Sequence, residues 1–191
     1  MSEGGRGILK KIYVFLADGF EEIEALTVVD LLRRAELDVV TVSIKEESQV
    51  MGSHQIPVTA DACFSKIDCS KGDLLVLPGG AVGTENLEKF QPLLELVKSF
   101  VAQDKKVAAI CAAPRILAGL GLLNGRKATS YPSVMEELTD AQTTTEAVAV
   151  DGCITTSRGL GTAIDFSLEL IGQLISREKA KEIAESVVYG K

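Results

Sequence analysis

VAAICAAP, residues 107–114, is the stretch that decides the fold, because a buried strand, a turn and a helix meet in it. Its first four residues form a short apolar run, and an apolar-rich helical pattern continues from 115 to 123. Cys111 therefore falls on the turn. Unpaired N–H groups and the macrodipole at a helix N-terminus favour an anion, so we expect a lowered pKa for the Cys111 thiol and a nucleophilic role. The alternative, a small apolar residue that closes a buried strand, stays open at this point.

Strand patterns alternate with helical patterns along the chain. The expected strands, of which the central ones are nearly continuous apolar runs, comprise residues 11–16, 38–44, 73–77, 107–110 and 127–130. The expected helices comprise residues 21–34, 93–101, 115–123, 163–175 and 177–188. Such alternation implies right-handed crossovers, so the predicted fold is α/β, a flavodoxin-like three-layer sandwich with a mostly parallel central sheet and helices on both faces. A small hairpin or an edge excursion is expected at 50–59, and a hairpin at 147–156 around Asp151-Gly152.

Length and charge exclude several classes of protein. The 191 residues suffice for one well-buried core, so we expect a single domain over residues 10–191, preceded by a flexible, polar tail over residues 1–9. A formal net charge of −7 without any basic block argues against binding to nucleic acid or to an anionic membrane. The apolar stretches fall well short of the roughly 18 residues of a membrane-spanning helix, and no signal-peptide core follows the tail. We therefore expect a cytoplasmic protein.

The cysteines and the histidine offer little for a metal or a disulfide framework. Cys63, Cys69, Cys111 and Cys153 follow no C-x-x-C spacing, so we expect free thiols. His54 is the one histidine, and no cysteine or second histidine stands at ligand spacing from it. The sequence thus predicts neither a metal nor a cofactor, and His54 is expected to be a surface residue.

Three strand ends carry chemically suggestive residues. Ligands of open α/β sheets bind beyond the carboxyl ends of the strands, and here these ends lead into DGFEEIE at 18–24, LPGG at 77–80 and Cys111. The first two glutamates of the acidic segment suit the first turn of a helix. Glu24 can point to solvent or across the strand ends, because its neighbours Ile23 and Leu26 are expected to face the core. The glycine pair lets the backbone approach a ligand, although a tight turn explains it as well.

Four motifs in order give a more specific signal: ADGFEEIE at 17–24, LPGG at 77–80, AAICAAP at 108–114 and TSRGLGT at 156–162. In these motifs, and along nearly its whole length from about residue 10, the chain resembles the ThiJ/PfpI superfamily, specifically the branch of the parkinsonism-associated protein deglycase. The resemblance implies a nucleophilic, oxidation-sensitive Cys111, a partner carboxyl in Glu24, and oxyanion-binding N–H groups on Gly80 and Ala112. The expected substrate-binding set is completed by Gly79, Tyr131 and Arg158. The resemblance also implies a homodimer.

Departures from related patterns narrow the choice of activity. Glutamine amidotransferases of this fold need a Gly-x-Cys-x-Gly elbow and a catalytic histidine, and neither is present here. Peptidase-like members place a histidine directly after the cysteine, where this chain has Ala112. In the deglycase branch a His-Pro pair often follows the next strand, whereas this chain has Tyr131-Pro132. A phenol with a pKa near 10 can hydrogen-bond a substrate but is a poor base at neutral pH.

The residues supply a nucleophile, an acid and oxyanion donors, and the resemblance to the superfamily implies a cysteine-dependent, cofactor-free enzyme of the glyoxalase III or protein deglycase type, which acts on small carbonyls such as methylglyoxal or glyoxal. The Cys111 thiolate would add to the aldehyde, the Gly80 and Ala112 N–H groups would stabilise the alkoxide, and Glu24 would move the proton. A non-enzymatic stress protein is the alternative, in which oxidation of Cys111 to sulfinate switches a redox-sensing or chaperone role. Turnover separates the two, since a sensor is consumed once per oxidation.

Overall fold

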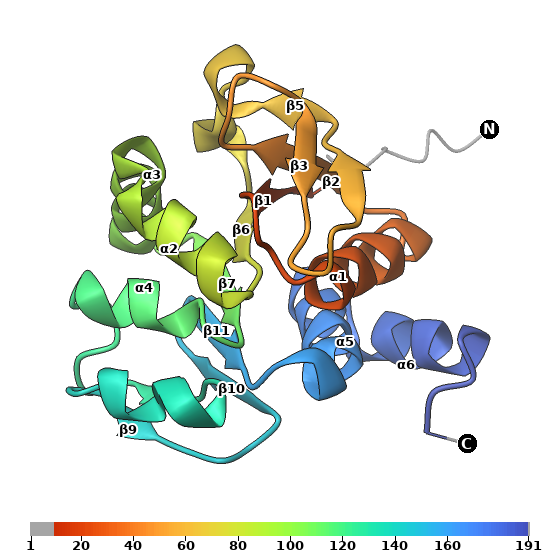
Figure 1. The fold of residues 1–191 in the computed structure, drawn as a ribbon. Helices are drawn as coiled ribbons and strands as arrows, with labels where there is room; N and C mark the ends of the chain where they lie inside the picture. Colours follow the sequence, from red (N-terminus) through yellow and green to blue (C-terminus); the bar gives the residue numbers. More distant parts are fainter. Residues whose placement is uncertain (1–9, 191) are drawn as a thin grey trace.

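The central feature of the computed structural model, which describes residues 10–190, is a twisted sheet of seven strands (Figure 1). The expected tail at residues 1–9 lies outside the described residues. The order across the sheet is β10-β11-β7-β6-β1-β2-β5, and each neighbouring pair is parallel except β10 with β11. The strands are β1 (Lys11–Leu16), β2 (Asp38–Ser43), β5 (Ala62–Cys63), β6 (Leu74–Leu77), β7 (Lys106–Ile110), β10 (Val148–Asp151) and β11 (Ile154–Ser157). The predicted, mostly parallel sheet is confirmed.

Helices cover both faces of this sheet. One face carries α1 (Glu22–Arg34), α5 (Ala163–Leu174) and α6 (Arg177–Ser186), and the other carries α2 (Ala81–Lys89), α3 (Gln91–Ala102) and α4 (Pro114–Gly119) (Figure 1). Side chains of β1 alternate between the layers: Val14 packs against the first group and Phe15 against the second. This alternation divides the buried apolar residues into two cores, and it confirms the three-layer sandwich.

Short elements complete the described chain. A hairpin of β3 (Gln49–Met51) and β4 (Pro57–Thr59) matches the expected one at 50–59, and Asp151-Gly152 turns β10 into β11 as expected, with Gly152 at a φ of 59°. Four 3₁₀ helices lie at Phe64–Lys66, Cys69–Lys71, Pro132–Glu137 and Leu160–Thr162. None of the helices within residues 10–190 combines the length and the apolar character that a bilayer crossing needs.

The structure corrects three expectations about individual elements. The strand expected at 127–130 does not enter the central sheet: β8 (Lys127–Ala128) pairs with β9 (Gln142–Thr143) in a separate ladder, because β11 lies beside β7. Helix α2 was not predicted, since its nine residues include only one fully buried large apolar side chain, Leu87. Helix α4 ends at Gly119, four residues earlier than expected.

The exposed face of α1 is the clearest departure from the sequence pattern. Ile23 and Leu26, which were expected in the core, are 49% and 36% exposed. Glu22 and Glu24 are buried instead, because the N-terminal turn of α1 faces the strand ends rather than solvent. The first turns of α1 thus present two apolar side chains outward and two carboxyl groups inward, while the later apolar residues of the helix pack in the core.

Strand order fixes where a ligand is expected. The chain runs from β1 outward to β2, then returns to the opposite side of β1 as β6 and continues outward to β7. The order therefore reverses beside β1, and a crevice opens there at the carboxyl ends of the strands. The segments that follow β1, β6 and β7 carry Glu24, Gly79 and Cys111, the predicted site residues.

Candidate active site

Cys111 occupies a strained turn between β7 and α4. Its φ is 65°, in the left-handed region that residues with a Cβ seldom adopt. Two hydrogen bonds hold this conformation: the Cys111 N–H donates to the carbonyl of Ser157 at 3.0 Å, and the Cys111 carbonyl accepts from the Tyr131 N–H at 2.9 Å. Backbone strain of this kind, of order 1–3 kcal/mol, persists where the surroundings enforce it and is concentrated at functional sites.

Glu24 is buried beside this turn, with 1% of its surface exposed. Its Oε2 accepts a hydrogen bond from the Gly79 N–H at 3.0 Å, and its own N–H donates to Glu21 Oε2 at 2.7 Å. Burial raises the pKa of Glu24 to about 7, and the charge of Glu21 adds to this, against the lowering effect of hydrogen bonds from Cys111 and Gly79. A carboxyl group with a pKa near 7 can both accept and return a proton at neutral pH.

The pKa of the Cys111 thiol corrects the expectation from the sequence. Burial raises this pKa to about 12, and the neighbouring Glu24 carboxylate raises it further, whereas the N–H groups of Gly80 and Ala112 lower it. The helix that was expected to favour the thiolate has only six residues, so its dipole is outweighed. Cys111 is therefore a thiol whose proton Glu24 can accept, rather than a preformed thiolate.

Glycine allows the segment after β6 to approach the cysteine. A methyl group on Gly79 would overlap Glu24 Oε2 and lie 2.5 Å from the Cys111 Cβ. Gly80 has a φ of 90°, and a methyl group there would collide with the carbonyl of Gly19. The glycine pair thus brings two N–H groups to the site, the one on Gly79 to Glu24 and the one on Gly80 to the sulfur.

The residues after β11 form the third side of the site. A methyl group on Gly159 would lie 3.6 Å from Glu24 Oε1 and 3.8 Å from the Cys111 sulfur. An open cavity of about 260 Å³ continues from there, lined by Tyr131, Pro132, Arg158 and residues 159–162. Tyr131 is half exposed, and Arg158 donates from Nη1 to the Thr145 carbonyl at 2.9 Å.

Sequence reasoning did not single out three residues of this site. Glu21 caps α1 through the hydrogen bond from the Glu24 N–H and is buried, whereas the sequence predicted only an acid in the first turn of a helix. Ser157 accepts the hydrogen bond from the Cys111 N–H, and Gly159 borders the sulfur. Ser157 and Gly159 both lie in the motif at 156–162. Their place at the end of a parallel strand was the signal that could have identified them.

One group of side chains in the described chain has the geometry of a metal site. Ligand atoms of Glu21, Glu22 and His54 lie within 4.8 Å of one another. This group was not predicted, because the sequence has no cysteine or second histidine at ligand spacing from His54. The buried Glu22 is already occupied: it accepts from the His54 N–H at 2.7 Å, from His54 Nδ1 at 2.8 Å and from the Ser53 hydroxyl at 3.0 Å. These bonds overcome burial and lower the pKa of Glu22 to about 2, and Glu22 in turn raises the pKa of His54. The hydrogen bonds of Glu22 with Ser53 and His54 therefore hold the β3–β4 hairpin at the start of α1.

The accessibility of the four thiols leads to a first prediction. Cys111 is half-buried, whereas Cys63, Cys69 and Cys153 are buried, and the pKa of Cys69 is raised to about 12 as well. We expect iodoacetamide to alkylate Cys111 first and peroxide to convert Cys111 first to sulfinate. A time course of peptide mass spectrometry measures the order. Earlier modification of any other cysteine would contradict the assignment of Cys111 as the reactive residue.

Comparisons with known proteins agree with this arrangement. A model described as the DJ-1/PfpI family matches residues 10–173. Protein DJ-1 homolog B of Arabidopsis thaliana is 42% identical over 94% of this chain and 41% of its own length, so the chain spans less than half of that relative. A protein named deglycase from Pyrococcus abyssi is 30% identical over 84% of this chain and 97% of its own. The solved structure of oxidized Toxoplasma gondii DJ-1 superimposes with a TM-score of 0.92 at 37% identity, covering 95% of this chain and all of the other.

Proposed function

The chain belongs to the DJ-1/PfpI family, and from this premise we propose that it converts small reactive carbonyls such as methylglyoxal and glyoxal to hydroxy acids, with Cys111 as the nucleophile and without a cofactor. The family and its relative named deglycase support a protective function of the DJ-1 type. The observation that carries the proposed chemistry is the pairing of a half-buried thiol with a buried carboxyl group whose pKa is about 7, and the relative named deglycase supports the substrate class. Nucleophile and base are thus supplied by the chain itself.

The first step of the proposed reaction forms a carbon–sulfur bond. Glu24 accepts the thiol proton of Cys111 while the sulfur attacks the aldehyde carbon. The carbonyl oxygen becomes an alkoxide, which the N–H groups of Gly80 and Ala112 stabilise, because both already face the sulfur closely enough to lower the pKa of its thiol. Protonation of the alkoxide by Glu24 gives a hemithioacetal and restores the carboxylate.

The second stage moves hydrogen within the substrate. For methylglyoxal, Glu24 removes the proton from the carbon bonded to sulfur and returns it to the neighbouring carbonyl carbon, while the hydroxyl proton of the hemithioacetal passes to the ketone oxygen. The aldehyde carbon is oxidised to a thioester and the ketone carbon is reduced to an alcohol, so no external oxidant or reductant enters. Water then cleaves the thioester to lactate and regenerates the thiol. A base with a pKa near the working pH suits both directions of this transfer.

A steady-state assay of lactate formation tests the proposed function. We expect many equivalents of lactate per protein, with saturation in methylglyoxal and without an added cofactor. Product limited to one equivalent, or formed at the rate seen in buffer, would overturn the proposal.

A second candidate function is favoured by the same donors. A sulfinate on Cys111 would place oxygen atoms where Gly80 and Ala112 present N–H groups and where a protonated Glu24 can donate. Oxidation would then switch a redox-sensing or chaperone role of a non-enzymatic protein. The two functions differ in turnover, and single-equivalent consumption of Cys111 together with inactivity on carbonyls would favour the sensor.

The apolar face of α1 supports a proposal about assembly. Ile23 and Leu26 are exposed there, and an open cavity of about 410 Å³ runs between α1 and the side chains of Ile164 and Val187. We infer that a second copy of this chain covers this face in a homodimer, since large exposed apolar side chains gathered on one face are typical of an interface.

The charge of −7 supports neither nucleic acid nor an anionic membrane as a partner, and the free thiols support a cytoplasmic location.

A charge on this face gives the second prediction. Leu26→Glu places a carboxylate at the proposed interface, and we expect the protein to change from dimer to monomer, as measured by size-exclusion chromatography with light scattering. Val150→Glu is the matched control, because Val150 is 41% exposed but lies on β10 at the edge of the sheet. A monomeric parent protein, or dissociation in the control as well, would contradict the proposed interface.

A further inference from the structure

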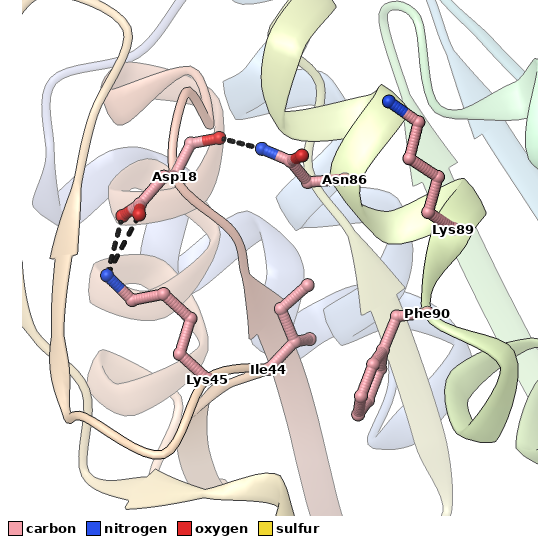
Figure 2. A pocket seen from close by; sticks show the side chains of 6 residues that line it. All are labelled: Asp18, Ile44, Lys45, Asn86, Lys89 and Phe90. Carbon is pink, nitrogen blue, oxygen red and sulfur yellow. Dashed lines mark hydrogen bonds and ion pairs between the residues drawn. The ribbon is translucent and has the colours of Figure 1, made fainter.

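A second cavity lies at the carboxyl ends of β1 and β2, and it contains none of the residues around Cys111. It has a volume of about 310 Å³ and is lined by Asp18, Ile44, Lys45, Asn86, Lys89 and Phe90 (Figure 2). Helix α2 supplies one wall, through Asn86 and Lys89, and the segments that follow β1 and β2 supply the other. A volume near the lower end of the range for ligand pockets fits a molecule of about one ring.

Most polar groups of this cavity are already paired. Lys45 Nζ lies 3.0 and 2.9 Å from the two carboxylate oxygens of Asp18, and Asp18 also accepts from the Met51 N–H at 2.8 Å. The side-chain amide of Asn86 donates to the Asp18 carbonyl at 2.8 Å. Figure 2 shows these bonds joining Lys45, Asp18 and Asn86 in one chain. This wall is therefore ordered and close to electrically neutral.

Lys89 is the exception. Within residues 10–190, no carboxylate oxygen lies within 4.0 Å of its ammonium group and no hydrogen bond engages it, and Figure 2 draws no bond between Lys89 and the other lining residues. Glu88 next to it pairs with Arg115 at 2.9 Å, and the exposed Glu85, one turn earlier, does not reach it. Lys89 is exposed, so an uncompensated positive charge lies at the open edge of the cavity in a protein whose net charge is −7.

The remaining walls are apolar. Ile44 and Phe90 are both half-buried, and the Phe90 ring packs edge-to-face on Phe64 with 5.1 Å between the ring centroids. This contact holds the ring in place, so that the apolar surface of the cavity is preformed.

We propose that this cavity binds a small organic monoanion, a carboxylate with a single apolar ring or short alkyl chain. Its carboxylate pairs with the Lys89 ammonium, and its apolar part lies against Ile44 and Phe90. A phosphate fits less well, because the site offers one unpaired cation and the Asp18 carboxylate would repel a second negative charge. This proposal does not depend on the chemistry of Cys111.

Benzoate is the probe that tests the proposal, with benzamide as its uncharged counterpart. In a titration followed by amide NMR, we expect saturable shifts for Ile44, Phe90 and the side-chain amide of Asn86, which benzamide produces only at higher concentration. Lys89→Gln is expected to weaken benzoate binding about three- to tenfold, as for a partly exposed charge pair, and Lys89→Glu to abolish it. Lys98→Gln on α3 is the control, since it removes the same charge from an exposed helical lysine elsewhere.

Three results would overturn the inference. Equal shifts with benzamide and benzoate would show an apolar pocket that does not select anions. Equal weakening by Lys98→Gln and Lys89→Gln would show nonspecific attraction. Shifts confined to residues around Cys111, such as Gly79 and Gly159, would place the anion in the other site.

Discussion

Cys111→Ser is expected to lower turnover on methylglyoxal by at least roughly 10³-fold, the scale on which enzymes lose rate when their nucleophile is removed. A serine hydroxyl fits the turn at a φ of 65° about as well as the thiol does, but it is a much weaker nucleophile. The N–H groups of Gly80 and Ala112 remain in place, so carbonyl binding persists while the carbon–sulfur bond can no longer form. The measurement is kcat/KM for lactate formation.

Cys63→Ser is the matched control for this prediction. Cys63 is buried, and its thiol donates to the Glu46 carbonyl at 3.2 Å, a hydrogen bond that serine can keep. We expect the control to retain the rate of the parent protein and both variants to unfold cooperatively. Activity in Cys111→Ser above a tenth of the parent rate would show that another residue performs the chemistry.

The layers of the fold could be predicted because strands buried on both faces leave a direct trace in the sequence. Runs such as 11–16 and 107–110 are nearly continuous apolar segments, and the structure places them at the centre of the sheet. Helix α2 left no such trace, since it buries few large apolar side chains. Ile23 and Leu26 were wrongly predicted to be buried, because an exposed apolar face has the same periodicity as a buried one.

The site could be predicted in part for a similar reason. Cys111 and Gly79 lie at the ends of neighbouring parallel strands, and strand ends are visible in a sequence. The pKa of the Cys111 thiol was predicted in the wrong direction, because burial and the closeness of the Glu24 carboxylate depend on tertiary contacts. The pairing of Glu22 with His54 was missed because it depends on tertiary contacts, such as the bridge between Phe20 and Gly52, that bring the hairpin to α1.

Glu24→Gln is expected to lower turnover by roughly 10²-fold, the usual scale for the loss of a positioned acid or base. Glutamine keeps an oxygen that can accept from the Gly79 N–H, so the site retains its shape, but it cannot take the thiol proton. The variant also removes a negative charge beside the sulfur, which lowers the pKa of the Cys111 thiol relative to the parent. We therefore expect alkylation of Cys111 at neutral pH to be as fast or faster, while turnover falls.

The dependence on pH distinguishes this role from a structural one. The carboxylate form of Glu24 accepts the thiol proton, so the parent rate should rise with pH through about 7, the pKa of Glu24, and the variant should lack this inflection.

The stability of the folded protein depends on pH in the opposite direction to the rate. Because the pKa of Glu24 is raised on folding, its protonated form contributes stability that is fully present below about 4.5 and is lost as pH rises through about 7. Thermal unfolding of the parent should show this loss, and that of Glu24→Gln should not.

Glu95→Gln is the control for these measurements, because Glu95 is an exposed residue of α3 and no ion pair engages it within residues 10–190. Glu21→Gln would be a poor control, since Glu21 caps α1 at the Glu24 N–H and raises the pKa of Glu24. Equal turnover in Glu24→Gln and Glu95→Gln would contradict the acid–base role. In that case the N–H groups of Gly80 and Ala112 would have to activate the thiol alone, and they do not overcome the effect of burial on its pKa.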